Sequence, residues 1–189
     1  PYIPAQTPET WLQIQPYAQF KDVIFVQPST SIIVYLLGII TIWVGFFFLK
    51  TRNGQRSRLW WGIALLLWGI GALLAGTSYE AFSYAIKCAG RDACLWTSWW
   101  EILYLIASVW SIDAMMLAVA HSSTTGKVRA ALSMYALLNA VVYFIVVIVG
   151  AFIPVKFLIS FDLLLIVAAP SIIAFFVING SRYAKLKQP

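Results

Sequence analysis

Five long apolar runs constrain the fold of this chain more than any other feature of its sequence. A helix needs about 20 predominantly apolar residues to cross a bilayer, and each run approaches or exceeds that length. The composition agrees, because 61% of the residues are hydrophobic and only 11% are charged. The sequence therefore predicts an all-α, polytopic integral membrane helix bundle with one transmembrane domain, residues 31–180. The five predicted transmembrane helices cover residues 31–49, 59–86, 96–121, 130–150 and 157–178.

The positive charges predict how this bundle is oriented. The net charge is +6, and nine of the 13 Lys and Arg residues fall in three clusters. These are Lys50, Arg52, Arg56 and Arg58, then Lys127 and Arg129, then Arg182, Lys185 and Lys187, while Lys21, Lys87, Arg91 and Lys156 lie in the alternate segments. Positive residues collect on the cytoplasmic side of membrane helices. The charge therefore indicates topology rather than a nucleic-acid partner: a multi-pass protein of the cell membrane, with its N-terminus outside and its C-terminus in the cytoplasm.

Two flanking segments complete the predicted organisation. Residues 1–30 form an extracytoplasmic, interfacial amphipathic segment, and residues 181–189 form a basic cytoplasmic tail. Thr7-Pro8-Glu9 is typical of a helix start, with an N-cap hydroxyl, Pro at the first helical position and an acid in the first turn. We expect the apolar, aromatic face of that helix to run on through Phe20; the alternative is an unstructured tail.

Small residues recur every seven positions in the first two predicted helices. They are Ser31, Gly38 and Gly45 in the first, and Gly62, Gly69, Gly76 and Ser83 in the second. Such spacing keeps small residues on one seam of a helix pair and lets the backbones approach closely. It predicts that the first two helices pack as a tight antiparallel hairpin.

The two cysteines, Cys88 and Cys94, fall in one predicted outer loop with Gly90 between them. A disulfide can form and persist on that side of the membrane, so we expect one here; two separate thiols are the alternative. The pair is a poor metal signature, and His121, the single histidine, is expected to cap its helix rather than to ligate metal. No metal or other cofactor is expected.

The third predicted helix is apolar except for a polar stripe. At 100° per residue a sector of about 80° contains Thr97, Glu101, Tyr104, Ser108, Ser111 and Met115. Asp113 stands off this stripe and deeper than Glu101, where we expect a buried partner such as Asn139 or a hydroxyl on a neighbouring helix. Asn139 itself belongs to a second stripe, with Tyr135 and Tyr143. These patterns predict that residues 96–121 lie in the interior of the bundle.

Three carboxylates on different predicted helices, Glu80, Glu101 and Asp162, are expected near the outer boundary. Together with nearby aromatic residues they predict a cavity in the outer half, with Glu101 close to water. The alternative is that Glu80 and Glu101 lie at the interface, where they snorkel or pair with Lys87 and Arg91 and only orient the helices. The candidate ligand- or ion-binding residues are Glu80, Glu101, Asp113, Asp162, Tyr104, Ser108 and Asn139.

The segment Gly76-Thr77-Ser78-Tyr79-Glu80-Ala81-Phe82, followed by Asp113, resembles the alkaline ceramidase and progestin/adiponectin receptor superfamily of seven-helix membrane hydrolases. That family carries S-x-x-x-H, an Asp and a final H-x-x-x-H, and its histidines hold zinc. Ser78 matches and Asp113 could match, but Phe82 stands where the first His belongs, and the last two helices with their histidines are absent. The resemblance implies a shared architecture with a degenerate site rather than an active amidase.

Three functions are compatible with this sequence. The first is a transporter- or receptor-like protein that binds a small ligand, lipid or cation in the outer-half cavity. The second is a ceramidase-like hydrolase relative, which ranks lower because the metal ligands are missing. The third is an accessory subunit whose polar stripes and glycine seams contact partner membrane helices. An enzyme is not expected, and the bilayer is a partner in all three.

Overall fold

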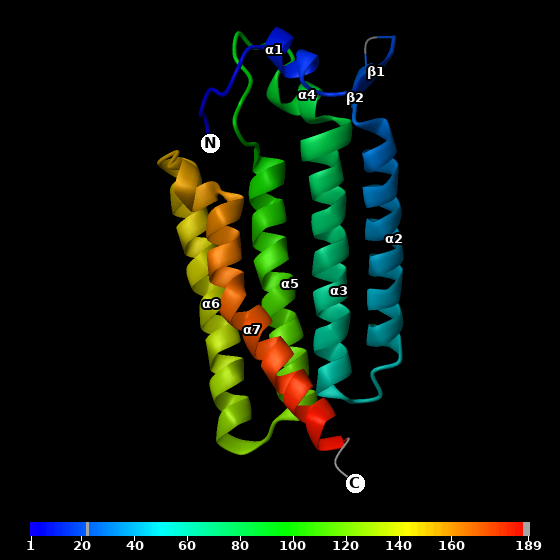
Figure 1. The fold of residues 1–189 in the computed structure, drawn as a ribbon, viewed down its shortest axis with the longest axis vertical. Coiled ribbons are helices and arrows are strands. Elements are labelled where there is room, and N and C mark those ends of the chain that lie inside the picture. Colours follow the sequence, from blue (N-terminus) through cyan, green and yellow to red (C-terminus); the bar gives the residue numbers. More distant parts are fainter. Residues whose placement is uncertain (22, 187–189) are drawn as a thin grey trace.

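The computed structural model describes residues 1–21 and 23–186, which form a bundle of long helices with a small cap at one end (Figure 1). The long helices are α2 (Pro28–Lys50), α3 (Arg56–Ala75), α5 (Trp99–Ser123), α6 (Gly126–Phe152) and α7 (Phe161–Leu186). With α3 extended to Ala81, five helices in the described part of the chain are long and apolar enough to cross a membrane. The predicted all-α membrane class is confirmed to that extent.

Local chemistry sets several helix boundaries away from the predicted ones. α2 begins at Pro28, three residues early, because proline fits the first helical turn. α5 begins at Trp99 rather than at residue 96, because the Ser98 hydroxyl accepts from the Glu101 N–H and caps the helix. α7 begins late, after the 3-10 turn η2 (Lys156–Ile159), and α7 then continues through Pro170. The tail beyond Leu186, including Lys187, lies outside the described residues.

The second predicted helix is not one α-helix over residues 59–86. α3 ends at Ala75 and a π-helix, η1 (Gly76–Ala81), follows it; after a break at Phe82 comes the short helix α4 (Ser83–Lys87). The N–H of Phe82 donates to the Thr77 carbonyl five residues back, at 3.0 Å. The hydroxyls of Thr77 and Ser78 donate to the carbonyls of Leu73 and Leu74, which competes with the regular ladder.

The glycine seam between α2 and α3 is confirmed. A Cβ added at Gly69 would lie 2.7 Å from the carbonyl oxygen of Gly38, and one at Gly62 would lie 3.1 Å from that of Gly45. The glycines therefore face each other in antiparallel order, and the two helices lie side by side (Figure 1). Any side chain at these positions would push the backbones apart.

Helix α5 forms the centre of the bundle, as predicted, between α3 on one side and α6 on the other (Figure 1). The apolar stretch of α5 is 67% buried, whereas the apolar stretches of the other four spans are 11–28% buried. Ile102, Val109 and other α5 side chains pack against Tyr143 and Val147 of α6 in the core. Ser111, on the polar stripe, donates to the Ala64 carbonyl of α3 at 2.9 Å.

The cap consists of the N-terminal segment, α4 and the loop that follows α4 (Figure 1). Helix α1 (Pro8–Gln13) starts as predicted, with the Thr7 hydroxyl accepting from the Thr10 N–H. It does not run on through Phe20, so the longer amphipathic helix is wrong. Pro16 cannot continue a helix, and the residues after it form an antiparallel pair of strands, β1 (Tyr17–Phe20) and β2 (Val23–Val26).

The cysteine prediction is confirmed, because Cys88 and Cys94 form a disulfide. The N-terminal segment is joined to the loop that this disulfide closes. Ala5 donates to the Cys94 carbonyl at 2.8 Å, Cys94 donates to Gln6 at 2.7 Å, and Trp96 donates to Ile3 at 2.7 Å. The disulfide therefore lies at the capped end of the bundle, opposite the α2–α3 turn and the C-terminal end of α7 (Figure 1).

Candidate functional site

Helix α5 carries two buried carboxylates at different depths. Glu101 is 1% exposed and Asp113 is 2% exposed. They are separated by about 18 Å along the helix axis. An ionised carboxylate at membrane depth needs a partner, so the contacts of each group decide what it can do.

Glu101 forms an ion pair with Lys87, and both side chains are almost completely buried. The ammonium nitrogen of Lys87 also lies 5.3 Å from the ring centre of Trp11 and 5.0 Å from that of Tyr79. The expectation that Glu101 lies close to water is therefore wrong. Since the chain breaks at Phe82, α4 follows a new course and brings Lys87 inward against α5. For this acid, the alternative pairing with Lys87 is what the structure shows.

Asp113 is held by donors from two other helices. The Asn139 amide of α6 donates to both carboxylate oxygens, at 3.1 and 3.0 Å, and the Ser171 hydroxyl of α7 donates to one of them at 3.0 Å. The predicted partnership with Asn139 is confirmed. Sequence reasoning did not identify Ser171, whose only local signal is a hydroxyl in an apolar run. This cluster joins α5, α6 and α7 near the middle of the bundle.

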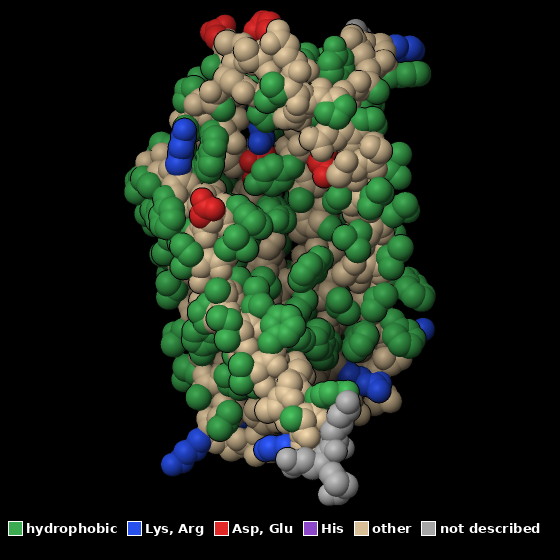
Figure 2. Space-filling view, in the orientation of Figure 1, with side chains coloured by type: hydrophobic (Ala, Val, Ile, Leu, Met, Phe, Trp, Pro, Cys, Tyr) green, Lys and Arg blue, Asp and Glu red, His purple; other side chains and the backbone are tan. Residues whose placement is uncertain are grey.

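The three carboxylates predicted to converge occupy different surroundings. Glu101 faces Lys87, whereas Asp162 is exposed in the first turn of α7. Glu80 is half-buried in η1, and one of its oxygens is buried without a hydrogen-bond partner in the described part of the chain. Charged groups are recessed among hydrophobic side chains in the upper half of the face in Figure 2. Of the three acids, Glu101 is therefore the one whose charge is neutralised by an internal cation, Lys87.

Aromatic hydroxyls continue inward from the ion pair. The rings of Tyr79 and Tyr104 meet edge to face, with their centres 5.7 Å apart. Tyr143 is 1% exposed, and its hydroxyl has no hydrogen-bond partner among the described residues. Tyr104 packs against the core cluster that contains Tyr143.

Two adjoining cavities, which we call the groove, lie between α3 and α7 with α5 as their floor. Each has a volume of about 240 Å³, and Trp68 and Ile112 line both. The upper cavity is also lined by Tyr104 and Ser108, two predicted site residues, and the lower one by Ser171 of the Asp113 cluster. The groove therefore brings the polar stripe of α5 to a surface. The face in Figure 2 is hollowed near its middle.

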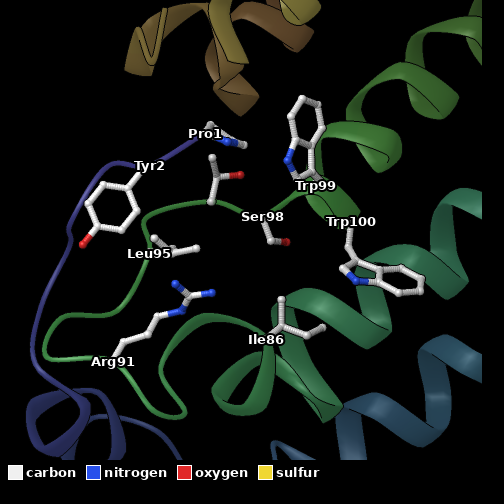
Figure 3. A pocket seen from close by; sticks show the side chains of 9 residues that line it. Pro1, Tyr2, Ile86, Arg91, Leu95, Ser98, Trp99 and Trp100 are labelled. Carbon is white, nitrogen blue, oxygen red and sulfur yellow. The ribbon is translucent and has the colours of Figure 1, made fainter. Parts of the chain in front are cut away.

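A third cavity, which we call the cap pocket, lies at the disulfide end and has a volume of about 350 Å³. Figure 3 shows the Arg91 side chain reaching into it from the disulfide loop, with Ser98 and Trp100 on the opposite wall. Arg91 was predicted only as a topology signal or a counter-charge for the acids. Sequence patterns did not indicate this pocket, because its walls come from separate parts of the chain: Pro1 and Tyr2 of the N-terminal segment, α4, the disulfide loop and the start of α5.

In the described part of the chain, no group of three or more His, Cys, Asp and Glu side chains could hold a metal ion. His121 lies in the last turn of α5, with its Nδ1 atom 2.9 Å from the Leu117 carbonyl. Comparisons with models of protein families, with curated proteins and with solved structures find no match. The resemblance to the ceramidase-like superfamily therefore stays a prediction.

Proposed function

We propose that this protein binds a lipid-like ligand in the groove between α3 and α7. The observation that carries the proposal is the groove itself, which is apolar along most of its length and has hydroxyl groups at its upper end. A cation is less well supported as the ligand. Glu101 is neutralised by Lys87, and Asp113 is occupied by Asn139 and Ser171.

The length of the groove fits one leaflet of a bilayer. Its floor runs from Tyr104 to Met115 of α5, which is about 16 Å along the helix axis. Half of the hydrocarbon core of a typical bilayer is about 15 Å thick. A single hydrocarbon chain that enters from the membrane would therefore lie along the whole groove.

The volume of the groove favours a chain over a partner helix. An α-helix with side chains is about 10–12 Å across, so one turn of it fills roughly 400–600 Å³. Each cavity, at about 240 Å³, holds less than one such turn. The rings of Trp61 and Phe175, 6.3 Å apart, also bring α3 and α7 together toward the inner end of the groove. These dimensions give less support to an accessory subunit that docks here through a helix.

A photoactivatable diacylglycerol added to membranes that contain the protein tests the proposal. We expect cross-links on Trp68, Ser108 and Ile172, mapped by mass spectrometry. Ser108→Phe, which fills the upper cavity, should reduce the cross-linking several-fold. The matched control is Val141→Phe, at an exposed position on the outer face of α6. Uniform cross-linking of all lipid-facing residues, unchanged by Ser108→Phe, would show that the groove has no ligand of its own.

We further propose that the disulfide end faces the outside of the cell membrane and the basic end faces the cytoplasm. Two observations support this orientation: nine positive charges in the three clusters against four in the alternate segments, and the disulfide at the opposite end. In a cysteine-free background, an impermeant thiol reagent should label Lys156→Cys in intact cells but not Gln55→Cys. Equal labelling of both positions would contradict the orientation.

A further inference from the structure

We propose that the cap pocket binds a phosphate group and that the lipid-like ligand of the groove therefore carries a phosphate headgroup. The inference rests on the proposed function for the hydrocarbon chain, but the phosphate site stands on separate observations. These are the position of Arg91, the buried hydroxyls of the pocket, and the placement of the pocket and the groove along the same row of α5 residues.

Arg91 is presented to the pocket by a constrained loop. The disulfide between Cys88 and Cys94 closes the loop, Gly90 turns it at φ +68°, and the Arg91 N–H donates to the Cys88 carbonyl at 3.1 Å. Figure 3 shows the guanidinium directed into the pocket. Among the described residues no acid forms an ion pair with it. A guanidinium offers five donors in a planar fork, which matches phosphate oxygens.

The wall opposite Arg91 supplies polar groups and an interfacial surface. Thr97 and Ser98 line the pocket with side chains that are 2% and 5% exposed, respectively. Trp99 and Trp100 line it while remaining about half exposed, as tryptophans at a membrane surface do. The pocket therefore has the composition expected at the headgroup level of a bilayer.

The acids near the cap pocket do not cancel the charge of Arg91. Glu101 lies one helical turn below Ser98 on α5, but it is paired with Lys87. Asp92 follows Arg91 in the loop and is exposed, and the pocket is lined by Arg91 rather than by Asp92. The net charge presented inside the pocket is consequently positive.

Residues along one face of α5 line first the cap pocket and then the groove. Trp100 lines the pocket, Tyr104 and Ser108 line the upper cavity of the groove, and Ile112 lines both cavities of the groove. These residues are four positions apart and follow one row of the helix surface. From Trp100 to Ile112 the row is about 18 Å long. A phosphate at Arg91 and a hydrocarbon chain in the groove can therefore belong to one molecule.

The test uses the full chain, purified in mild detergent and delipidated. Binding of dipalmitoyl phosphatidic acid, dipalmitoylglycerol and inorganic phosphate is measured by native mass spectrometry and by tryptophan fluorescence. The two lipids share their chains and differ by the phosphate. We expect phosphatidic acid to bind roughly tenfold more tightly than dipalmitoylglycerol, which is the usual contribution of a charge-assisted hydrogen bond. Arg91→Gln should remove this difference and leave dipalmitoylglycerol binding unchanged.

Matched variants keep the outcome interpretable. Lys21→Gln removes a positive charge at the same end but outside the pocket, so the preference for phosphatidic acid should persist. Arg91→Lys keeps the positive charge but loses the planar fork of guanidinium donors, so it should retain part of the preference for phosphatidic acid. The melting temperatures of all three variants should match that of the wild type, because both side chains are exposed.

The possible results separate this inference from the proposed function. Equal affinity of the wild type for the two lipids would overturn the phosphate site and leave the groove proposal intact. A preference for phosphatidic acid that survives Arg91→Gln would overturn the assignment to this pocket. Binding of neither lipid would overturn the groove proposal, and Arg91-dependent binding of inorganic phosphate would then support a site for free phosphate.

Discussion

Glu101→Gln is expected to destabilise the protein strongly, because the change leaves a buried lysine without its counter-ion. The side chains of Lys87 and Glu101 are 4% and 1% exposed, so water cannot replace the lost charge without local opening. Removing one partner of a buried ion pair costs about 3–5 kcal/mol. The new amide at position 101 can still accept a hydrogen bond from Lys87, and the Trp11 and Tyr79 rings remain. We therefore expect a value near the lower limit, about 3 kcal/mol.

The same reasoning predicts that a second substitution restores stability. Replacing both members of a buried ion pair by apolar residues is often neutral, because the cost of desolvating two charges disappears with them. Lys87→Met combined with Glu101→Leu should therefore lie within about 1 kcal/mol of the wild type. A double-mutant cycle isolates the interaction from the effects of the single changes.

The assay is reversible unfolding in mixed micelles, titrated with a denaturing detergent, and melting temperatures give an independent readout. Asp162→Asn is the matched control, because this acid is exposed in the first turn of α7. It should change the free energy of unfolding by less than about 0.5 kcal/mol. If Glu101→Gln and Asp162→Asn had equal effects, the buried ion pair would contribute nothing to folding, and the expected loss of stability would be refuted.

Three further predictions concern the seam, the central cluster and the loop. Gly69→Ala should destabilise by about 1–3 kcal/mol in the same assay, because its Cβ meets the opposite backbone; Gly180→Ala, which faces open space, should not. Asp113→Leu should lower the melting temperature more than Asp113→Asn, since only the former leaves the Asn139 amide without an acceptor. A buried donor left without a partner costs about 1–3 kcal/mol. Cys88→Ala should cost at most about 3 kcal/mol and speed proteolysis of the outer loop without unfolding the long helices.

Features that are set by the residues of a single helix or of one short loop could be predicted from the sequence. The apolar runs set the number of long helices, and glycines seven residues apart located the α2–α3 contact, since both depend on the geometry of a single helix. The disulfide followed from two cysteines in one short loop. The polar stripe, which also depends on the geometry of a single helix, placed α5 in the interior of the bundle.

Contacts that depend on how elements are turned relative to one another were predicted less well. Lys87 was considered as a partner of Glu101, but its burial depends on the break at Phe82, which has no periodic signal. Ser171 lies 58 residues from Asp113, so only the packing of α7 on α5 brings the two together. The β-strands of the cap depend on Pro16 ending the first helix, a signal that the apolar, aromatic pattern on both sides of it obscures.

The π-helix η1 makes the number of residues in this segment more important than their identity. A π-turn contains one residue more than the α-helical ladder needs, and each residue of a helix advances the chain by about 100° and 1.5 Å. Deleting one residue between Gly76 and Ala81 would return this segment to the α-helical ladder, whereas inserting one would rotate everything beyond it by about a quarter of a turn. After such an insertion the contacts of the cap would be lost. Lys87 would swing away from Glu101, and Cys88 would carry the disulfide loop and Arg91 with it. We expect conservative substitutions and a single-residue deletion in η1 to be tolerated and an insertion to be damaging, so this segment should accept a change of composition more readily than an increase in length.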